Sequence, residues 1–116
     1  MTALVVDAHH HLWDPARADY PWMTDDLAAI RRRFDVSDLV PVLDASGVDA
    51  TVLVQTRSST AESREFLATA AATPRIAGVV AWTDLASPAV ADDLAALREA
   101  PGGDRLVGIR HQVHDE

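Results

Sequence analysis

The sequence predicts an α/β fold built on a parallel sheet, and two observations lead to this prediction. Four short runs rich in Val, Ile and Leu are apolar at consecutive positions rather than at alternating ones, as in strands that are buried on both faces. Helical patterns separate these runs, and such alternation is typical of right-handed βαβ units. The runs cover residues 3–9, 50–55, 76–82 and 106–111.

The first helical pattern covers residues 37–46, after a long loop over residues 12–36. Four apolar side chains fall on one stripe of this helix: Val36, Leu39, Val40 and Leu43. Gly47 follows where a helix end favours a left-handed residue. Pro41 is unfavourable within this helix, but it is tolerated if it lies near the first turn.

Two further helical patterns begin with capping signals. Ser59 and Glu62 have the spacing of a capping box, in which each residue bonds the backbone of the other. Ser87 precedes Pro88, which predicts a serine N-cap and a proline at the first helical position. These helices are expected over residues 60–73 and 88–100.

The predicted order of elements suggests part of a larger barrel. Strands two to four recur at about 30 residues per unit, which is the length of a βα repeat. About four such units form half of a (β/α)8 barrel of the TIM type, whose whole needs about 250 residues. We therefore expect residues 1–116 to be a single partial domain, the N-terminal half of such a barrel. The competing interpretation is a complete, small, open sheet.

Composition excludes several functional classes. The chain is 48% hydrophobic and 24% charged, as in a globular protein, and its net charge of -8 argues against nucleic-acid binding. It contains no cysteine, so it has neither disulfides nor a thiolate site. No apolar run approaches a membrane span and no signal peptide is recognised, which predicts a cytoplasmic protein without a membrane partner. Nucleotide-binding glycine loops and a serine-esterase elbow are also missing from the sequence.

The strongest chemical signal follows the first predicted strand. Because strand side chains alternate between faces, Asp7, His9 and His11 share one face, whereas His10 lies on the other and is assigned a structural role. Catalytic groups gather at the carboxyl ends of barrel strands. Neutral imidazoles bind zinc and similar metals, and Asp7 is either a further ligand or a group that orients a histidine. A His-x-His pair alone is a weak signal, but its position after a buried strand favours a catalytic or metal-binding pair.

Other candidates follow the second and fourth predicted strands. Gln55 either donates to a substrate oxygen or simply closes its strand. Arg110 is expected to point inward, because it shares parity with Gly108, and its forked donors suit a carboxylate or sugar oxygen. His111 is a further substrate-binding candidate. Trp13, in the long first loop, either stacks on a sugar ring or anchors the loop.

The chain resembles a known group of hydrolases along essentially its whole length. The segments "VVDAHHHLWDP", "DYPWM", "GVDATVLVQ", "IAGVVAWTDL" and "LVGIRHQVHDE" resemble the amidohydrolase-related lactonases, the L-fuconolactonase-like relatives of 2-pyrone-4,6-dicarboxylate lactonase. This resemblance implies a (β/α)8 barrel. It also implies that His9 and His11 bind one divalent metal, zinc being the favoured ion, or polarise the substrate carbonyl directly in members without metal. The family's later histidine and water-activating aspartate have no counterpart in residues 1–116, so the chain is expected to be incomplete and inactive alone.

The expected function is thus hydrolysis of a small-molecule lactone of a sugar acid or a related lactone. One alternative keeps the fold and changes the reaction to a metal-dependent decarboxylation within the same superfamily. Another alternative is a non-catalytic, truncated module that self-associates through the open edges of its sheet, giving a homo-oligomer.

Overall fold

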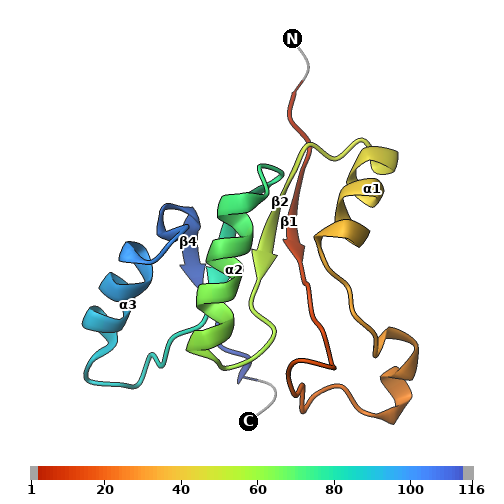
Figure 1. Cartoon of the computed structure of the whole chain (residues 1–116). Helices are drawn as coiled ribbons and strands as arrows, with labels where there is room; N and C mark the ends of the chain where they lie inside the picture. Colours follow the sequence, from red (N-terminus) through yellow and green to blue (C-terminus); the bar gives the residue numbers. More distant parts are fainter. Residues whose placement is uncertain (1–2, 114–116) are drawn as a thin grey trace.

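The computed structural model describes residues 3–113, which form four strands and three α-helices in strict alternation, with a long loop between the first strand and the first helix (Figure 1). The predicted order of elements is confirmed. The elements are β1 (Val6–His10), the 3-10 helix η1 (Asp25–Ile30), α1 (Val36–Ser46), β2 (Ala50–Val54), α2 (Thr60–Ala72), β3 (Ile76–Ala81), α3 (Val90–Glu99), the 3-10 turn η2 (Gly103–Arg105) and β4 (Leu106–Ile109).

The four strands form one sheet in the order β1-β2-β3-β4, and each neighbouring pair is parallel. The prediction of a parallel sheet is confirmed. Because all the strands run parallel, their four carboxyl ends lie at one edge of the sheet. Figure 1 shows the strand arrows pointing to that edge, and the long first loop lies there too. Side chains that follow the strands are thereby brought to a common edge.

The helices cover the sheet through a continuous apolar core. Helix α2 packs against β3, α3 contributes one buried side chain to the same cluster, and α1 and β4 contribute partly buried side chains around it. The buried members of the cluster are Leu12, Leu53, Phe66, Leu67, Ala70, Ile76, Val79, Ala81 and Leu97. The outer strands are less covered, since Val6 in β1 is 50% exposed and Val107 in β4 is 63% exposed. No helix within residues 3–113 is long and apolar enough to cross a membrane.

Helix α1 departs from its prediction at its start and at its proline. It is capped by Asp35, whose carboxylate accepts from Ser37 N while the Asp38 side chain accepts from Asp35 N. Gly47 ends the helix with φ 69°, as expected. Pro41 lies in the second turn of the helix, so the condition of a place near the first turn is not met. The helix continues through the proline although one backbone donor is missing.

Two capping predictions are only partly right. The Ser59 hydroxyl accepts from Glu62 N, but the Glu62 carboxylate does not complete the capping box and instead binds the loop before the helix. Helix α3 begins at Val90, with Ala89 as an N-cap that forms no side-chain bond. The Ser87 hydroxyl accepts from Ala89 N and so stabilises a turn before the helix, because serine side chains also bond to backbone in turns.

Candidate active site

The end of β1 brings two imidazole rings together. The register of β1 against β2 shifts between Asp7 and His10, which is an irregularity of the bulge type. Despite this shift, His9 and His11 converge: their Nε2 atoms lie 3.1 Å apart and their rings meet edge to face at 4.8 Å between centroids. The two predicted catalytic histidines therefore form a pair at the carboxyl edge of the sheet.

The orientation of His11 is set by a backbone carbonyl. Its Nδ1 lies 2.9 Å from Val54 O, and because a carbonyl only accepts, Nδ1 carries the proton. The Nε2 lone pair of a neutral His11 then faces His9. Burial lowers the pKa of His11 more than the Val54 carbonyl raises it, which favours the neutral ring.

His10 lies on the opposite face from this pair. Its Nδ1 forms a hydrogen bond with the hydroxyl of Thr51, a residue that is fully buried in β2. Burial also lowers the pKa of His10. Its Nε2 is buried and has no hydrogen-bond partner among residues 3–113. These contacts fit the structural role expected for His10.

The Asp7 side chain contacts the backbone of β1. Its carboxylate accepts from the backbone N of His9 at 3.0 Å, and so it stabilises the irregular end of β1. The orienting partner of His11 is Val54 O instead. Within the described part of the chain, no group of three or more His, Asp or Glu side chains is arranged to hold a metal.

Arg110 follows β4, the outer strand opposite to β1, and its side chain reaches the histidine pair. Its Nη1 lies 3.3 Å from His9 Nε2, and its Nε donates to Gln55 Oε1 at 2.6 Å. The backbone N of Arg110 continues the sheet ladder by donating to Ala81 O at 2.9 Å. Arg110 and Gln55, chosen from the sequence as substrate-binding candidates, therefore lie in one hydrogen-bonded cluster with His9.

Gln55 is enclosed by protein. Its side chain is fully buried. Besides accepting from Arg110, it donates from Nε2 to Arg57 O at 3.1 Å and to Gln112 Oε1 at 3.5 Å. Each polar atom of the side chain thus has a protein partner, which leaves no group directed at a ligand.

His111 contacts a tryptophan that the sequence left without a role. The indole Nε1 of Trp82, just after β3, donates to His111 Nδ1 at 3.0 Å. His111 also lines a cavity of about 640 Å³ at the carboxyl edge of the sheet. The other lining residues are Asp19, Pro21, Trp22, Thr56, Arg57, Ser58, Ser59 and Gln112. In the sequence, the feature that could have indicated this contact is the position of Trp82 at the end of a predicted strand.

Trp13 anchors the first loop beside the histidine pair. Its indole donates to Ile30 O at 3.0 Å, and its backbone pairs with Phe34 in an antiparallel bridge. The indole is also stacked near His11, with ring centroids 6.2 Å apart. These contacts are those of a residue that anchors the loop, which is the second of the two predicted roles of Trp13. Its ring also lies beside His11.

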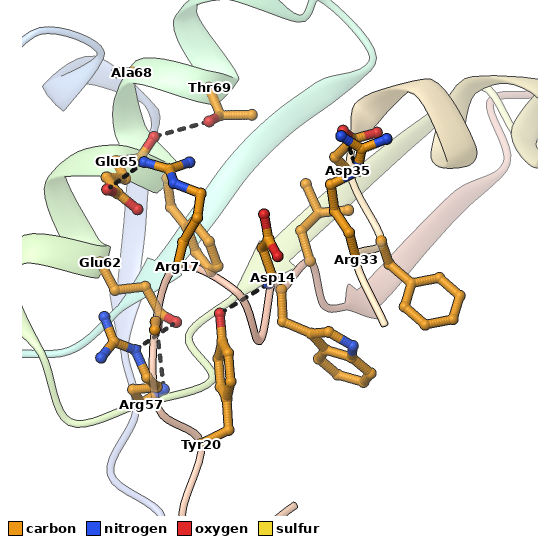
Figure 2. A pocket seen from close by; sticks show the side chains of 15 residues that line it. Asp14, Arg17, Tyr20, Arg33, Asp35, Arg57, Glu62, Glu65, Ala68 and Thr69 are labelled. Atoms are coloured by element: carbon orange, nitrogen blue, oxygen red, sulfur yellow. Dashed lines mark hydrogen bonds and ion pairs between the residues drawn. The ribbon is translucent and has the colours of Figure 1, made fainter. Parts of the chain in front are cut away.

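A second cavity, of about 470 Å³, lies between the first loop and α2 (Figure 2). Several of its charged side chains form ion pairs, with Arg17 3.4 Å from Glu65 and Arg57 3.7 Å from Glu62. Tyr20 closes one side, and its hydroxyl accepts from Asp14 N at 3.0 Å. Neither histidine of the pair lines this cavity. This cavity is therefore separate from the histidine pair.

The donor set of the pair suits a divalent metal. A zinc ion bonds to imidazole nitrogen at about 2.0–2.1 Å, and one ion can reach both nitrogens of a pair with the observed 3.1 Å separation. The proton on His11 Nδ1 leaves its Nε2 lone pair available as a ligand. His9 and His11 would fill two positions of such a site.

The fold and the site together define the class of protein. A consecutive parallel sheet with chemical groups at its carboxyl edge is the architecture of β/α-barrel enzymes. The chain belongs to the amidohydrolase family, whose model matches residues 6–116. Among its relatives, an L-fucono-1,5-lactonase of Burkholderia multivorans is 37% identical over 116 residues, which is 100% of this chain and 38% of the relative. An L-fucono-1,5-lactonase of Burkholderia ambifaria is 39% identical over 110 residues, 95% of this chain and 37% of the relative.

Solved structures give the same assignment. Two crystal structures of an amidohydrolase from Burkholderia multivorans, one with bound HEPES and one with bound zinc, each superpose with a TM-score of 0.88 at 36% identity. They cover 98% of this chain and are themselves covered to 38% and 39%. The chain thus spans about 38% of the length of the lactonase first named above. The predicted fold class, the N-terminal part of a β/α barrel with parallel strands, is confirmed.

Proposed function

We propose that the chain contributes the electrophilic part of the active site of a lactone hydrolase, acting on a lactone of a small sugar acid. The observation that carries this proposal is the cluster of His9, His11 and Arg110 at the carboxyl edge, with Nε2 atoms 3.1 Å apart and a guanidinium 3.3 Å from His9. The names of the two Burkholderia relatives support the choice of a lactone over other substrates.

The chemistry of lactone opening fits these groups. Water forms a bond to the lactone carbonyl carbon, negative charge develops on the carbonyl oxygen, and the ring C–O bond then breaks to give a hydroxy acid. Arg110 is permanently cationic and presents Nη1 on the same side as the imidazole pair. The Arg110 guanidinium is thereby prearranged as a donor to a carbonyl oxygen bound beside the imidazole pair, where negative charge develops.

We propose His9 and His11 as the ligands of one divalent cation, with zinc favoured by the imidazole donors. When bound, such an ion supplies Lewis acidity that polarises the lactone carbonyl. The chain's own residues then hold and orient it: Val54 O fixes the ring of His11, and the Asp7 carboxylate fixes the backbone of His9. Without a metal, the cationic Arg110 and the Nε2–H tautomer of His9 polarise the carbonyl directly, while His11 accepts from His9.

A base that activates water is also required. Within residues 3–113, no carboxylate forms a hydrogen bond with the ring of His9 or His11. We propose that the base is an aspartate in βα units beyond residue 116, and that residues 1–116 are one partial domain of the barrel. Under this proposal the 116-residue chain alone does not turn over lactones.

The function is tested by proton release from a panel of sugar-acid 1,4- and 1,5-lactones, measured with a pH indicator on the full-length protein. Catalysed proton release from at least one lactone is expected. A folded protein that hydrolyses none of them, or that instead releases carbon dioxide from carboxylated substrates, would contradict the proposal. The latter outcome would favour the decarboxylase alternative. The self-association alternative predicts that the 116-residue chain forms an oligomer, which size-exclusion chromatography would detect.

A further inference from the structure

We propose that Gln55 is a positioning residue that holds the Arg110 guanidinium toward His9, rather than a ligand of the substrate. This inference deepens the proposed lactone hydrolysis and rests on it for its catalytic consequence. Its structural part rests only on the contacts of Gln55, which is fully buried just after β2. A side chain without exposed surface cannot donate to a ligand unless the cluster opens.

Gln55 binds Arg110 at two points. The Nε of Arg110 donates to the Oε1 of Gln55 at 2.6 Å, and Nη2 donates to the Gln55 backbone carbonyl at 3.4 Å. Two contacts from one residue fix the plane of a guanidinium group, since its donors form a rigid fork. The remaining terminal nitrogen, Nη1, is the one that lies 3.3 Å from His9 Nε2.

The amide of Gln55 is itself held in one orientation. Its Nε2 donates to Arg57 O at 3.1 Å, so a flipped amide would direct NH2 donors at the guanidinium. The backbone N of Arg57 donates in turn to the buried Glu62 carboxylate at 3.1 Å. Helix α2 is thereby connected through its preceding loop to Gln55, and Gln55 connects to Arg110.

The choice of an amide has an electrostatic consequence. A carboxylate at position 55 would bind the guanidinium more strongly, but it would also neutralise its charge. The neutral amide orients Arg110 and leaves its positive charge available for the developing oxyanion. A glutamine with all its polar atoms engaged therefore suits a group that positions a catalytic cation.

The structural part is tested by hydrogen exchange of the Arg110 side-chain Nε–H in the 15N-labelled full-length protein. Its resonance is assigned by its loss in R110K. We expect Gln55→Leu to accelerate exchange about tenfold or more, because a hydrogen bond to a charged group is lost. Gln55→Met removes the same acceptor and serves if the leucine variant does not fold.

Thr83→Val is the matched control, since Thr83 is equally buried after β3 and its hydroxyl has no hydrogen-bond partner within residues 3–113. It should leave the exchange rate unchanged. Unaltered exchange in folded Gln55 variants would overturn the proposal, whatever reaction the protein catalyses.

The catalytic part is tested by a double-mutant cycle in kcat/KM for the lactone that the full-length protein hydrolyses. Gln55→Leu should lower kcat/KM about tenfold in the wild-type background. In the Arg110→Ala background the same change should have less than about a twofold effect, because Gln55 acts through Arg110. Independent, multiplicative losses would overturn the positioning role. If the wild-type protein hydrolyses no lactone, the proposed function fails, while the exchange experiment still decides the contact.

Discussion

The carboxylate of Glu62, in the first turn of α2, accepts hydrogen bonds from both the backbone N and the hydroxyl of Thr56 at the end of β2. Glu62 is almost fully buried, and burial raises the pKa of its carboxyl beyond what these hydrogen bonds offset. One ionisable group in the core thus supports the loop between β2 and α2.

We expect this group to make the free energy of unfolding depend on pH. The folded-state pKa of Glu62 lies above the unfolded value, near 4.5, so the folded state binds the proton more tightly. Its contribution to stability is therefore greatest below that value and declines as pH rises through the folded pKa. Glu62→Gln should remove this decline. Urea denaturation across a pH series measures it, and identical pH profiles for both proteins would contradict the assignment.

The histidine triplet provides a test of the face assignment. Replacing His9 or His11 by Ala should lower kcat by about 100-fold or more, because we propose that both groups act at the reacting carbonyl. His10→Ala should change kcat far less and instead lower the melting temperature, since His10 bonds buried Thr51 on the other face. Lactone hydrolysis and thermal unfolding are measured for all three variants. Equal losses of kcat at the three positions would refute the assignment.

Metal binding can be measured apart from catalysis. We expect the full-length protein, after chelation and titration with zinc, to bind one ion, as detected by elemental analysis. His9→Ala and His11→Ala should each reduce this binding strongly, whereas His10→Ala should retain it. Zinc uptake that is insensitive to both His9 and His11 would place the ion elsewhere. Lactone hydrolysis by the chelated protein would indicate the direct role of the imidazoles.

Two glycines with positive φ offer a matched pair for stability. A Cβ added at Gly102 would lie 1.9 Å from Leu67 O, while one at Gly47 would meet no atom within 4 Å. Gly47→Ala should cost about 1–2 kcal/mol for the left-handed backbone alone. Gly102→Ala should cost clearly more, because backbone atoms of α2 must also move. Chemical denaturation compares the two, and equal losses would contradict the close approach of Gly102 to α2.

Local patterns made much of the fold predictable. The strands, the helices and the facing of His9 and His11 follow from the periodicity of apolar and polar residues within a few positions. The errors are local as well. Ser87 bonds the second residue after it and so stabilises a turn, whereas the expected cap needs the same hydroxyl at the helix start. Both arrangements are compatible with the same two letters, Ser-Pro.

The link from Gln55 to Arg110 could not be predicted in the same way. These residues are 55 positions apart, and their contact depends on the register of β2, β3 and β4 together. Likewise, Glu62 has the right spacing for a capping box, but its burial draws the carboxylate to the unpaired backbone donors of Thr56 and Arg57. Sequence identified these residues as candidates, whereas tertiary packing determined which atoms they contact.

Arg110 and His9 come from the two outermost strands of the sheet and nevertheless approach to 3.3 Å. In a flat sheet the backbones of those strands would stand about 14 Å apart, three strand spacings. The long guanidinium side chain of Arg110 and the imidazole of His9 together reach across that span. The contact therefore depends on all three strand pairings at once, so a change that displaces any one strand from its neighbour should separate the guanidinium from the imidazole.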